Sequence, residues 1–192
     1  MNLQRIHYVT QRYKRLQGLS NLPFAFCLLA VGLRDALRLD GQTITLLELP
    51  GAFTLRLIDL VGLVALGLMA SVIVLRKPIA ATYQNRYGYV ESKPLPAWAW
   101  FLAFALLYGA LFGEASVPSV SLFALTMSLL LGVLWQTHHL QIHYAAMAVL
   151  LAVLSPLLTH PVAAPVVSGG VVLVAGIFDH LLLVNTFTQG DD

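Results

Sequence analysis

Hydrophobic residues occur along this chain in long runs separated by short polar segments. The runs cover residues 16–33, 57–75, 94–113, 119–135, 142–158 and 164–184. A helix needs about 20 apolar residues to cross a bilayer, and the segment from Ala115 to Phe178 holds no Asp, Glu, Lys or Arg at all. A soluble domain carries about one charged residue in four. The pattern therefore predicts an all-α integral membrane protein, a six-transmembrane-helix bundle over residues 16–184.

The overall composition points to the same class of protein. The chain has 192 residues, of which 58% are hydrophobic and 10% charged, and its mean hydropathy is +0.79. These values are typical of a polytopic membrane protein. The net charge of +2 is too small to indicate a nucleic-acid partner. The single cysteine, Cys27, lies within the first apolar run, so we expect a buried small side chain and no disulfide.

The segments outside the six runs are short. Residues 1–15 place apolar residues at helical spacing among arginines and a lysine, which predicts a basic amphipathic segment on an anionic membrane surface; a solvated tail is the alternative. The first run ends in Arg34-Asp35 with no small-residue cleavage site, so it is expected to be retained as a span. Residues 185–192 are expected to form a cytoplasmic tail.

The positive charges predict the orientation. An even number of spans puts both termini on one side, and Lys and Arg are enriched on the cytoplasmic side. One predicted side carries Arg5, Arg12, Lys14, Arg15, Arg76, Lys77, Arg86 and Lys93, and the other carries Arg34, Arg38 and Arg56. The chain is therefore expected in the cytoplasmic (inner) membrane with both termini inside, N-in/C-in. Membrane lipid is then its first partner.

Two loops between the runs have recognisable patterns. The outer loop, Arg34 to Arg56, alternates polar and apolar residues around Asp40-Gly41, which predicts a β-hairpin at 37–46. An amphipathic helix from Arg34 to Leu39 is the competing interpretation. The inner loop, Arg76 to Lys93, mixes basic residues with tyrosines, a composition that favours contact with lipid headgroups over contact with a cytoplasmic partner.

The third run carries small residues four positions apart, at Ala105, Gly109 and Gly113. Such spacing lets two helix backbones approach closely, so this stripe predicts a packing face. Packing within the bundle is the favoured use, because every helix needs neighbours. The alternative is contact with another membrane subunit or with a second copy of the chain.

Few ionisable residues are expected at membrane depth. Asp59 follows Arg56 by three residues at the start of the second span, so a local ion pair at the headgroup level is expected there. The segment from Gln136 to His143 contains three histidines, His138, His139 and His143. His139 and His143 are one helical turn apart, a spacing that suits two ligands of zinc, iron or copper. The favoured interpretation is a cytoplasmic turn without metal, since the chain has no His-Glu-x-x-His motif.

Asp179-His180 interrupts the sixth run about a turn and a half before its predicted cytoplasmic end. A carboxylate at this depth is costly, so Asp179 is expected to face the bundle and to have a polar partner. The candidates on the same predicted side are His143, His138, Arg76 and the basic N-terminal segment. A structural tether is the favoured role, ahead of a proton or ion relay or a metal ligand.

These patterns lead to two functional hypotheses. The first is a non-enzymatic transporter subunit, permease or accessory membrane component with a cytoplasmic-side His/Asp polar cluster, for which no catalytic residue and no cofactor is predicted. The second is a membrane-embedded metal-dependent enzyme or redox protein that uses His138, His139 and His143 with Asp179 or His180. The first is favoured, because polar groups at span ends need no catalysis to explain them.

Overall fold

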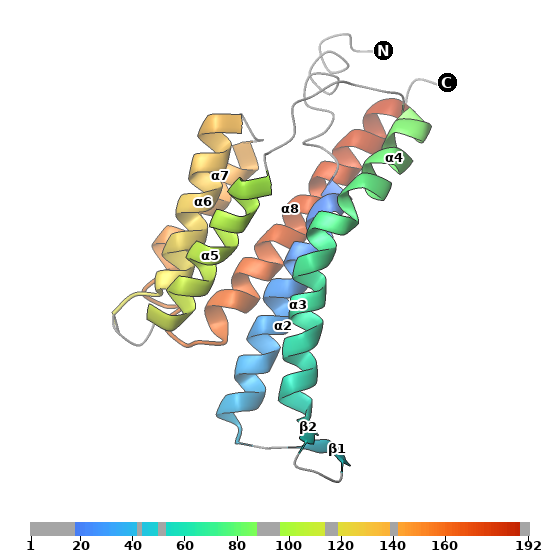
Figure 1. Ribbon diagram of the computed structural model, residues 1–192. Helices are drawn as coiled ribbons and strands as arrows, with labels where there is room; N and C mark the ends of the chain where they lie inside the picture. Colours follow the sequence, from blue (N-terminus) through green and yellow to red (C-terminus); the bar gives the residue numbers. More distant parts are fainter. Residues whose placement is uncertain are drawn as a thin grey trace.

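This computed structural model describes residues 18–41, 44–49, 53–87, 97–113, 119–138 and 142–188. The predicted basic segment 1–15 and residues 189–192 of the predicted tail lie outside these ranges. In chain order the elements are η1 (Gly18–Asn21), α2 (Leu22–Leu39), β1 (Thr45–Leu49), β2 (Phe53–Arg56), α3 (Leu57–Val74), α4 (Arg76–Tyr87), α5 (Ala97–Gly113), α6 (Leu122–His138), α7 (Ile142–Leu154) and α8 (Ala163–Thr188) (Figure 1).

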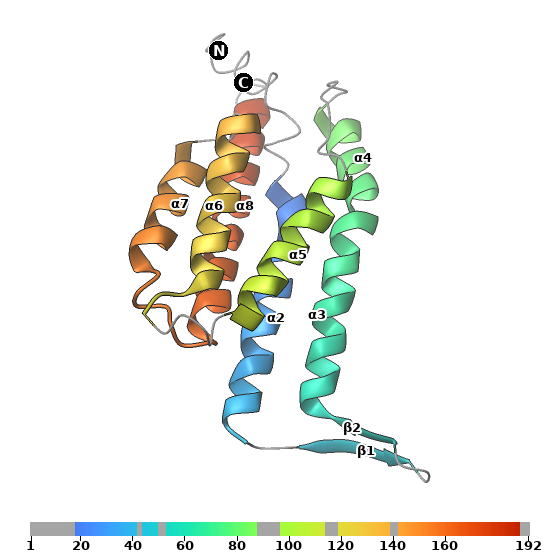
Figure 2. The ribbon, with the colours of Figure 1, turned by 60° about the vertical axis from the view of Figure 1, so that its left-hand side comes forward.

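The prediction of an all-helical bundle is confirmed at the level of fold class. Each of the six apolar runs forms a helix, namely α2, α3, α5, α6, α7 and α8, and successive members of this set run in opposite directions (Figures 1 and 2). The start of α2 and the end of α8 therefore lie at one end of the bundle, beside α4, which is called the α4 end here. The β1–β2 pair lies at the other end, the hairpin end.

The lengths of the helices support membrane crossing only in part. Among the described residues, α8 is the one helix long and apolar enough to cross a membrane by itself, and α3 with α4 could supply a second across a bend of 50°. Helices α6 and α7 are apolar but shorter, and α2 has Arg34, Asp35 and Arg38 in its last turns. The helical fold is thus established, while six membrane crossings remain a proposal.

Helix α4 corrects the prediction for the inner loop. Residues 76–87, expected to be part of a loop, continue the chain as a second helix at 50° to α3. Pro78 accounts for the bend, because proline has no backbone N–H to bond the carbonyl four residues earlier and is tolerated only in a first helical turn. The Ile79 amide still bonds the Leu75 carbonyl at 3.0 Å, so the chain turns without losing its helical path.

The β-hairpin exists, but not at the predicted position. Helix α2 continues to Leu39, as the competing interpretation had it. Gly41 follows its C-cap, and the φ of 66° at this position suits glycine after a helix. The antiparallel strands are β1 and β2, with Leu49 opposite Phe53, so residues 50–52, which lie outside the described part, connect them. The error came from taking Asp40-Gly41 as a hairpin turn when it ends a helix.

Asp59 contacts the predicted residue, Arg56, through the Arg56 backbone and not through the Arg56 side chain. Its carboxylate Oδ2 accepts a hydrogen bond from the backbone amide of Arg56 at 3.2 Å, where an ion pair with the Arg56 side chain was expected. The amides at a helix start lack partners within the helix, and an acidic side chain in the first turn satisfies one of them. Asp59 therefore stabilises the start of α3.

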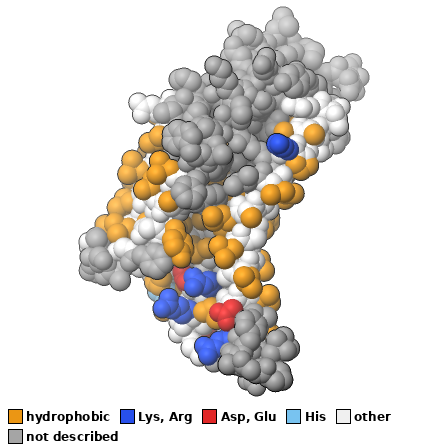
Figure 3. All heavy atoms as spheres, in the orientation of Figure 1, with side chains coloured by type: hydrophobic (Ala, Val, Ile, Leu, Met, Phe, Trp, Pro, Cys, Tyr) orange, Lys and Arg blue, Asp and Glu red, His pale blue; other side chains and the backbone are white. Residues whose placement is uncertain are grey.

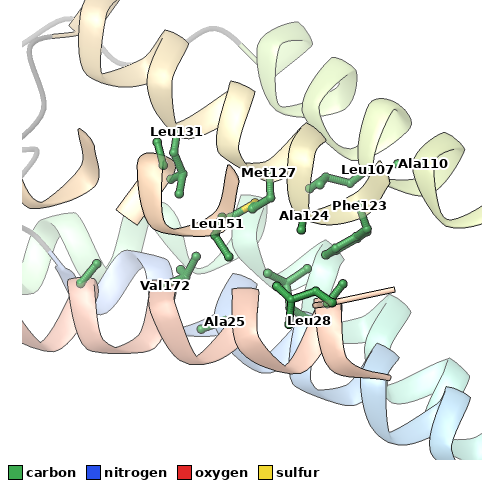
Figure 4. Packing of buried hydrophobic residues seen from close by; sticks show 14 of the residues in the cluster. Ala25, Leu28, Leu107, Ala110, Phe123, Ala124, Met127, Leu131, Leu151 and Val172 are labelled. Carbon is green, nitrogen blue, oxygen red and sulfur yellow. The ribbon is translucent and has the colours of Figure 1, made fainter. Parts of the chain in front are cut away.

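The core lies between two groups of helices, α2, α3 and α8 on one side and α5, α6 and α7 on the other (Figures 1 and 2). Phe123, Met127 and Leu151 fill the space between them, facing Ala25 and Leu28 of α2 (Figure 4). Helices α2 and α8 lie close together at Gly169, where an added Cβ would lie 3.0 Å from the Ala25 carbonyl oxygen. Small residues in α2 and α8 thus set the spacing of this pair.

The predicted packing stripe on α5 is used only at one end within the bundle. At Gly113, an added Cβ would lie 3.0 Å from Leu122, so this glycine packs against α6. Ala105 and Gly109 are exposed, and nothing lies within 4 Å of a Cβ placed on Gly109. The favoured intramolecular use therefore applies to Gly113, and contact of the remaining stripe with another subunit or a second copy stays a prediction.

Candidate functional site

The buried carboxylate of Asp179 is the centre of the candidate site. Asp179 lies in the second half of α8, toward the α4 end, and 0% of its surface is exposed. The expectation that it faces the bundle is confirmed by this burial. A carboxylate without water needs hydrogen-bond donors from the protein, because burying an unpaired charge is costly. The donors come from elements that are distant in the sequence.

Tyr144 supplies the direct hydrogen bond. Its hydroxyl donates to Oδ2 of Asp179 at 2.7 Å, and the amide nitrogen of Asn21 donates to the same hydroxyl at 3.2 Å. Tyr144 lies in the first turn of α7, and Asn21 ends η1 just before α2. The chain Asn21–Tyr144–Asp179 therefore connects the starts of α2 and α7 to α8.

His143 faces the other oxygen of the carboxylate. Its Nε2 lies 3.3 Å from Oδ1 of Asp179, within ion-pair distance. The two atoms are nevertheless not aligned for a hydrogen bond, and neither has a hydrogen-bond partner among the described residues. The imidazole also packs edge-on against Phe178, with ring centroids 5.2 Å apart. The His143 side chain is 19% exposed, so this face of the site reaches the surface.

His180, next to Asp179 in the sequence, points to a different element. Its Nδ1 lies 2.6 Å from the hydroxyl of Tyr83 in α4, with the two rings at 74° to one another. Tyr83 is 4% exposed, so its contact with His180 attaches α4 to α8 at a buried position. Successive helical residues point about 100° apart, which explains why Asp179 contacts α7 and His180 contacts α4.

The structure brings together only part of the predicted set. His143 lies beside Asp179, as one of the named candidates, whereas His180 lies against Tyr83. His138 is the last residue of α6 and its side chain lies outside the described part, as does all of His139. Within the described ranges, no group of three or more His, Cys, Asp or Glu side chains is placed to hold a metal ion. The metal hypothesis for His138, His139 and His143 therefore stays a prediction.

Three residues of the site were not predicted: Asn21, Tyr144 and Tyr83. Asn21 and Tyr144 do carry a signal, because each is a polar group inside an apolar run and Tyr144 directly follows a candidate histidine. Tyr83 lies in the segment that was expected to be a loop. Ser168 is a further buried polar residue whose hydroxyl has no partner among the described residues. It lies about three turns along α8 from Asp179, outside this site.

The chemistry available at the site is that of proton donors and acceptors. It combines a carboxylate, an imidazole, a phenol and an amide, all at one end of the bundle. None of these contacts has the serine–histidine or cysteine–histidine arrangement of nucleophilic catalysis. Comparison of the chain with family models, with curated protein sequences and with solved structures finds no match in any of the three. The function must therefore be argued from the geometry alone.

Proposed function

We propose that this chain is a polytopic inner-membrane protein with six spans and both termini in the cytoplasm, working as a non-enzymatic transporter subunit, permease or accessory component. In this proposal the helices α2, α3, α5, α6, α7 and α8 are the spans. The contact set of Asn21, Tyr144, His143 and Asp179, the Asp179 junction, holds the bundle together at its cytoplasmic end.

The distribution of apolar side chains supports the membrane placement. Large hydrophobic residues point outward from the helices of both groups and are exposed in the isolated chain. Examples are Leu63, Leu66, Leu102, Leu129, Val149, Val153, Val174 and Phe178. On the face seen in Figure 3, hydrophobic side chains cover the middle of the bundle, and basic and acidic side chains gather at the hairpin end. Soluble monomers rarely expose apolar patches larger than a few hundred Å², whereas lipid covers such a surface.

The short helices fit the proposal if they stand nearly upright. At 1.5 Å per residue, α6 with 17 residues is about 25 Å long and α7 with 13 residues about 20 Å. These lengths are below the roughly 30 Å of a bilayer core. A thinner local bilayer and the apolar turn from Ser155 to Leu158 after α7 compensate for the difference at modest cost.

The observation that carries the functional proposal is the Asp179 junction itself. Apart from it, the contacts of α7 with α8 are few, and the two groups of helices meet mainly through apolar packing of α6. A polar contact that joins two helix groups inside lipid is strong enough to hold them and specific enough to be released. This arrangement suits a component that changes its packing when a partner or solute binds.

Membrane extraction and co-purification test the proposal. The full chain is expected to stay in the membrane pellet after alkaline carbonate washing, and a mild-detergent pull-down from native membranes is expected to recover a defined partner. The Asp179→Asn variant, which keeps the shape but removes the charge, serves as the matched comparison, with Asp35→Asn as control. Release by carbonate would contradict the membrane placement. A pull-down that recovers only the chain itself would contradict the role as a subunit or accessory component.

A further inference from the structure

Two buried atoms of the Asp179 junction face one another without a hydrogen bond. Oδ1 of Asp179 and Nε2 of His143 are 3.3 Å apart, both are inaccessible to solvent, and neither has a partner among the described residues. Buried polar atoms are nearly always paired in native proteins, so such a pair calls for an explanation. The simplest species that satisfies an oxygen acceptor and a nitrogen acceptor at this separation is a proton between them.

The charge balance of the pair points to one proton. With no titratable proton, a carboxylate beside a neutral imidazole leaves a negative charge buried in a bundle that lipid surrounds. With two protons, a carboxylic acid beside an imidazolium leaves a positive charge. With one proton the pair is neutral overall, whichever residue carries it. A net charge at low dielectric costs roughly several kcal/mol, so the one-proton state of the pair is favoured.

We propose that Asp179 and His143 form a single proton-binding site, in which the proton enters through His143. The His143 side chain is 19% exposed and Asp179 is 0% exposed, so the imidazole is the member of the pair that reaches the surface of the bundle. His143 also lies in the first turn of α7, at the α4 end of the bundle. A proton taken up there by the imidazole reaches the carboxylate without crossing the apolar core.

Tyr144 fixes which carboxylate oxygen receives the proton. Its hydroxyl donates to Oδ2 at 2.7 Å and is itself held by Asn21, so Oδ2 is occupied as an acceptor. Oδ1 is the oxygen left free, and it faces His143. In the transfer the Nε2–H bond of the imidazolium breaks and an Oδ1–H bond forms, and the two opposite charges cancel. No other atom gains or loses a proton.

Among the described side chains, the other elements packed on α8 do not supply a competing charge to this pair. From α7 the titratable neighbours are His143 and Tyr144, and from α4 Tyr83 contacts the adjacent His180. Asn21 of η1 is neutral. The charged residues of α2 lie near the hairpin end, its Cys27 thiol donates to the Ala65 carbonyl of α3, and α6 has no ionisable group among its described side chains.

The inference deepens the proposed function, because it names the proton as a ligand of the Asp179 junction. It rests on that proposal only in taking lipid to surround the bundle. Infrared difference spectroscopy of the full chain in lipid nanodiscs, stepped from pH 4 to pH 10, tests it. One component of the carboxylic-acid carbonyl absorption that changes with pH is expected in the wild-type chain and in Asp35→Asn, and this component is expected to be missing from Asp179→Asn, where the other carboxyl groups still absorb. Carbon-13 labelling of aspartate identifies the band as an aspartic acid.

The role of His143 is tested by the midpoint of the same band. In His143→Gln the midpoint is expected to move, because the carboxylate loses the imidazole that faces it, whereas His160→Gln, an exposed histidine at the opposite end, leaves it unchanged. An Asp179 band with the same midpoint in His143→Gln, or no Asp179 band at any pH, overturns the inference.

If a variant does not purify as one species, the test is made on the wild-type chain alone, by comparing two of its own infrared bands. One midpoint shared by the carboxyl band and a histidine ring band supports the pair, and two separate midpoints overturn it. Loss of the band leaves the membrane and pull-down results unaffected, so the two proposals fail separately.

Discussion

The hydroxyl of Tyr144 donates a 2.7 Å hydrogen bond to Oδ2 of Asp179 and so joins the first turn of α7 to the second half of α8. Hydrogen bonds to a charged acceptor are shorter and stronger than those between neutral groups. This one is also buried, so water cannot replace the hydroxyl if it is removed. The relationship between these two residues therefore sets the first prediction.

Replacing Tyr144 by phenylalanine is expected to destabilise the bundle by about 1–3 kcal/mol, because a buried carboxylate oxygen loses its donor. Thermal unfolding of detergent-purified protein, followed by circular dichroism, measures the effect. Tyr108→Phe is the matched control, since that side chain is 63% exposed and lies outside the Asp179 junction. Equal melting temperatures for the two variants would contradict the importance of the Tyr144 bond.

Replacing Tyr83 by phenylalanine is expected to loosen α4 without unfolding the bundle. The variant loses the 2.6 Å contact with His180 Nδ1, which is worth about 0.5–1.5 kcal/mol, and keeps the ring packing. Hydrogen–deuterium exchange should then become faster in Arg76–Tyr87, while exchange in α6 stays at the wild-type rate. Unchanged protection of α4 would show that the hydroxyl does not attach it. Thr82→Val, an exposed position on the same helix, is the control.

Adjacent glycines of α8 are expected to respond in opposite directions to alanine. At Gly169 the added Cβ would lie 3.0 Å from the Ala25 carbonyl oxygen and from Leu29, so α2 and α8 must separate, at a cost of about 1–3 kcal/mol. At Gly170 nothing lies within 4 Å, and alanine should stabilise the helix by about 0.5–1 kcal/mol. Thermal unfolding of the two variants side by side provides the measurement. A Gly169→Ala variant as stable as Gly170→Ala would contradict the close approach of α2 and α8.

Asp35 is expected to make the stability depend on pH. Its carboxyl is half-buried near the end of α2, and this burial raises its pKa, although Arg34 and Arg38 oppose the rise. The folded chain therefore holds a proton that the unfolded chain releases, so Asp35 favours folding at acid pH and loses this contribution as the pH rises above about 4.

Asp35→Asn removes that titration. Its melting temperature should exceed that of the wild-type chain by about 1–2 °C at pH 7 and equal it at pH 3. Asp40→Asn, at an exposed position, should match the wild-type chain at both pH values. A wild-type chain more stable than Asp35→Asn at pH 7 would contradict the direction of the shift.

The helices were predictable because each has a long apolar run with clear breaks. The ranges 57–75 and 94–113 correspond to α3 (Leu57–Val74) and α5 (Ala97–Gly113), and 164–184 lies within α8 (Ala163–Thr188). Membrane crossing was not established in the same way, because α6 and α7 are short and α2 ends in charged residues. Hydropathy measures how apolar a segment is, and it does not give the length of the helix that forms.

The positions that failed depend on short-range backbone chemistry or on contacts across the fold. Asp40-Gly41 fits a hairpin turn and a helix end equally well, and only the neighbouring packing of α2 decides between them. Asp179 was identified because a lone acid in an apolar run is costly. Its donor Tyr144 was missed, because a tyrosine at the edge of an apolar run looks like an interface residue until the fold places it against α8.

The close pairing of α2 with α8 has a consequence for how the protein is made. These are the first and the last of the described long helices, and η1 also contacts α8. During synthesis α3 is made directly after α2 and can pack against it at once, whereas the other packing surface of α2 waits until α8 emerges from the ribosome. Contacts between distant parts of a chain form late. A ribosome that stalls before α8 therefore leaves an unfinished bundle, in which the face of α2 that packs on Gly169 is uncovered.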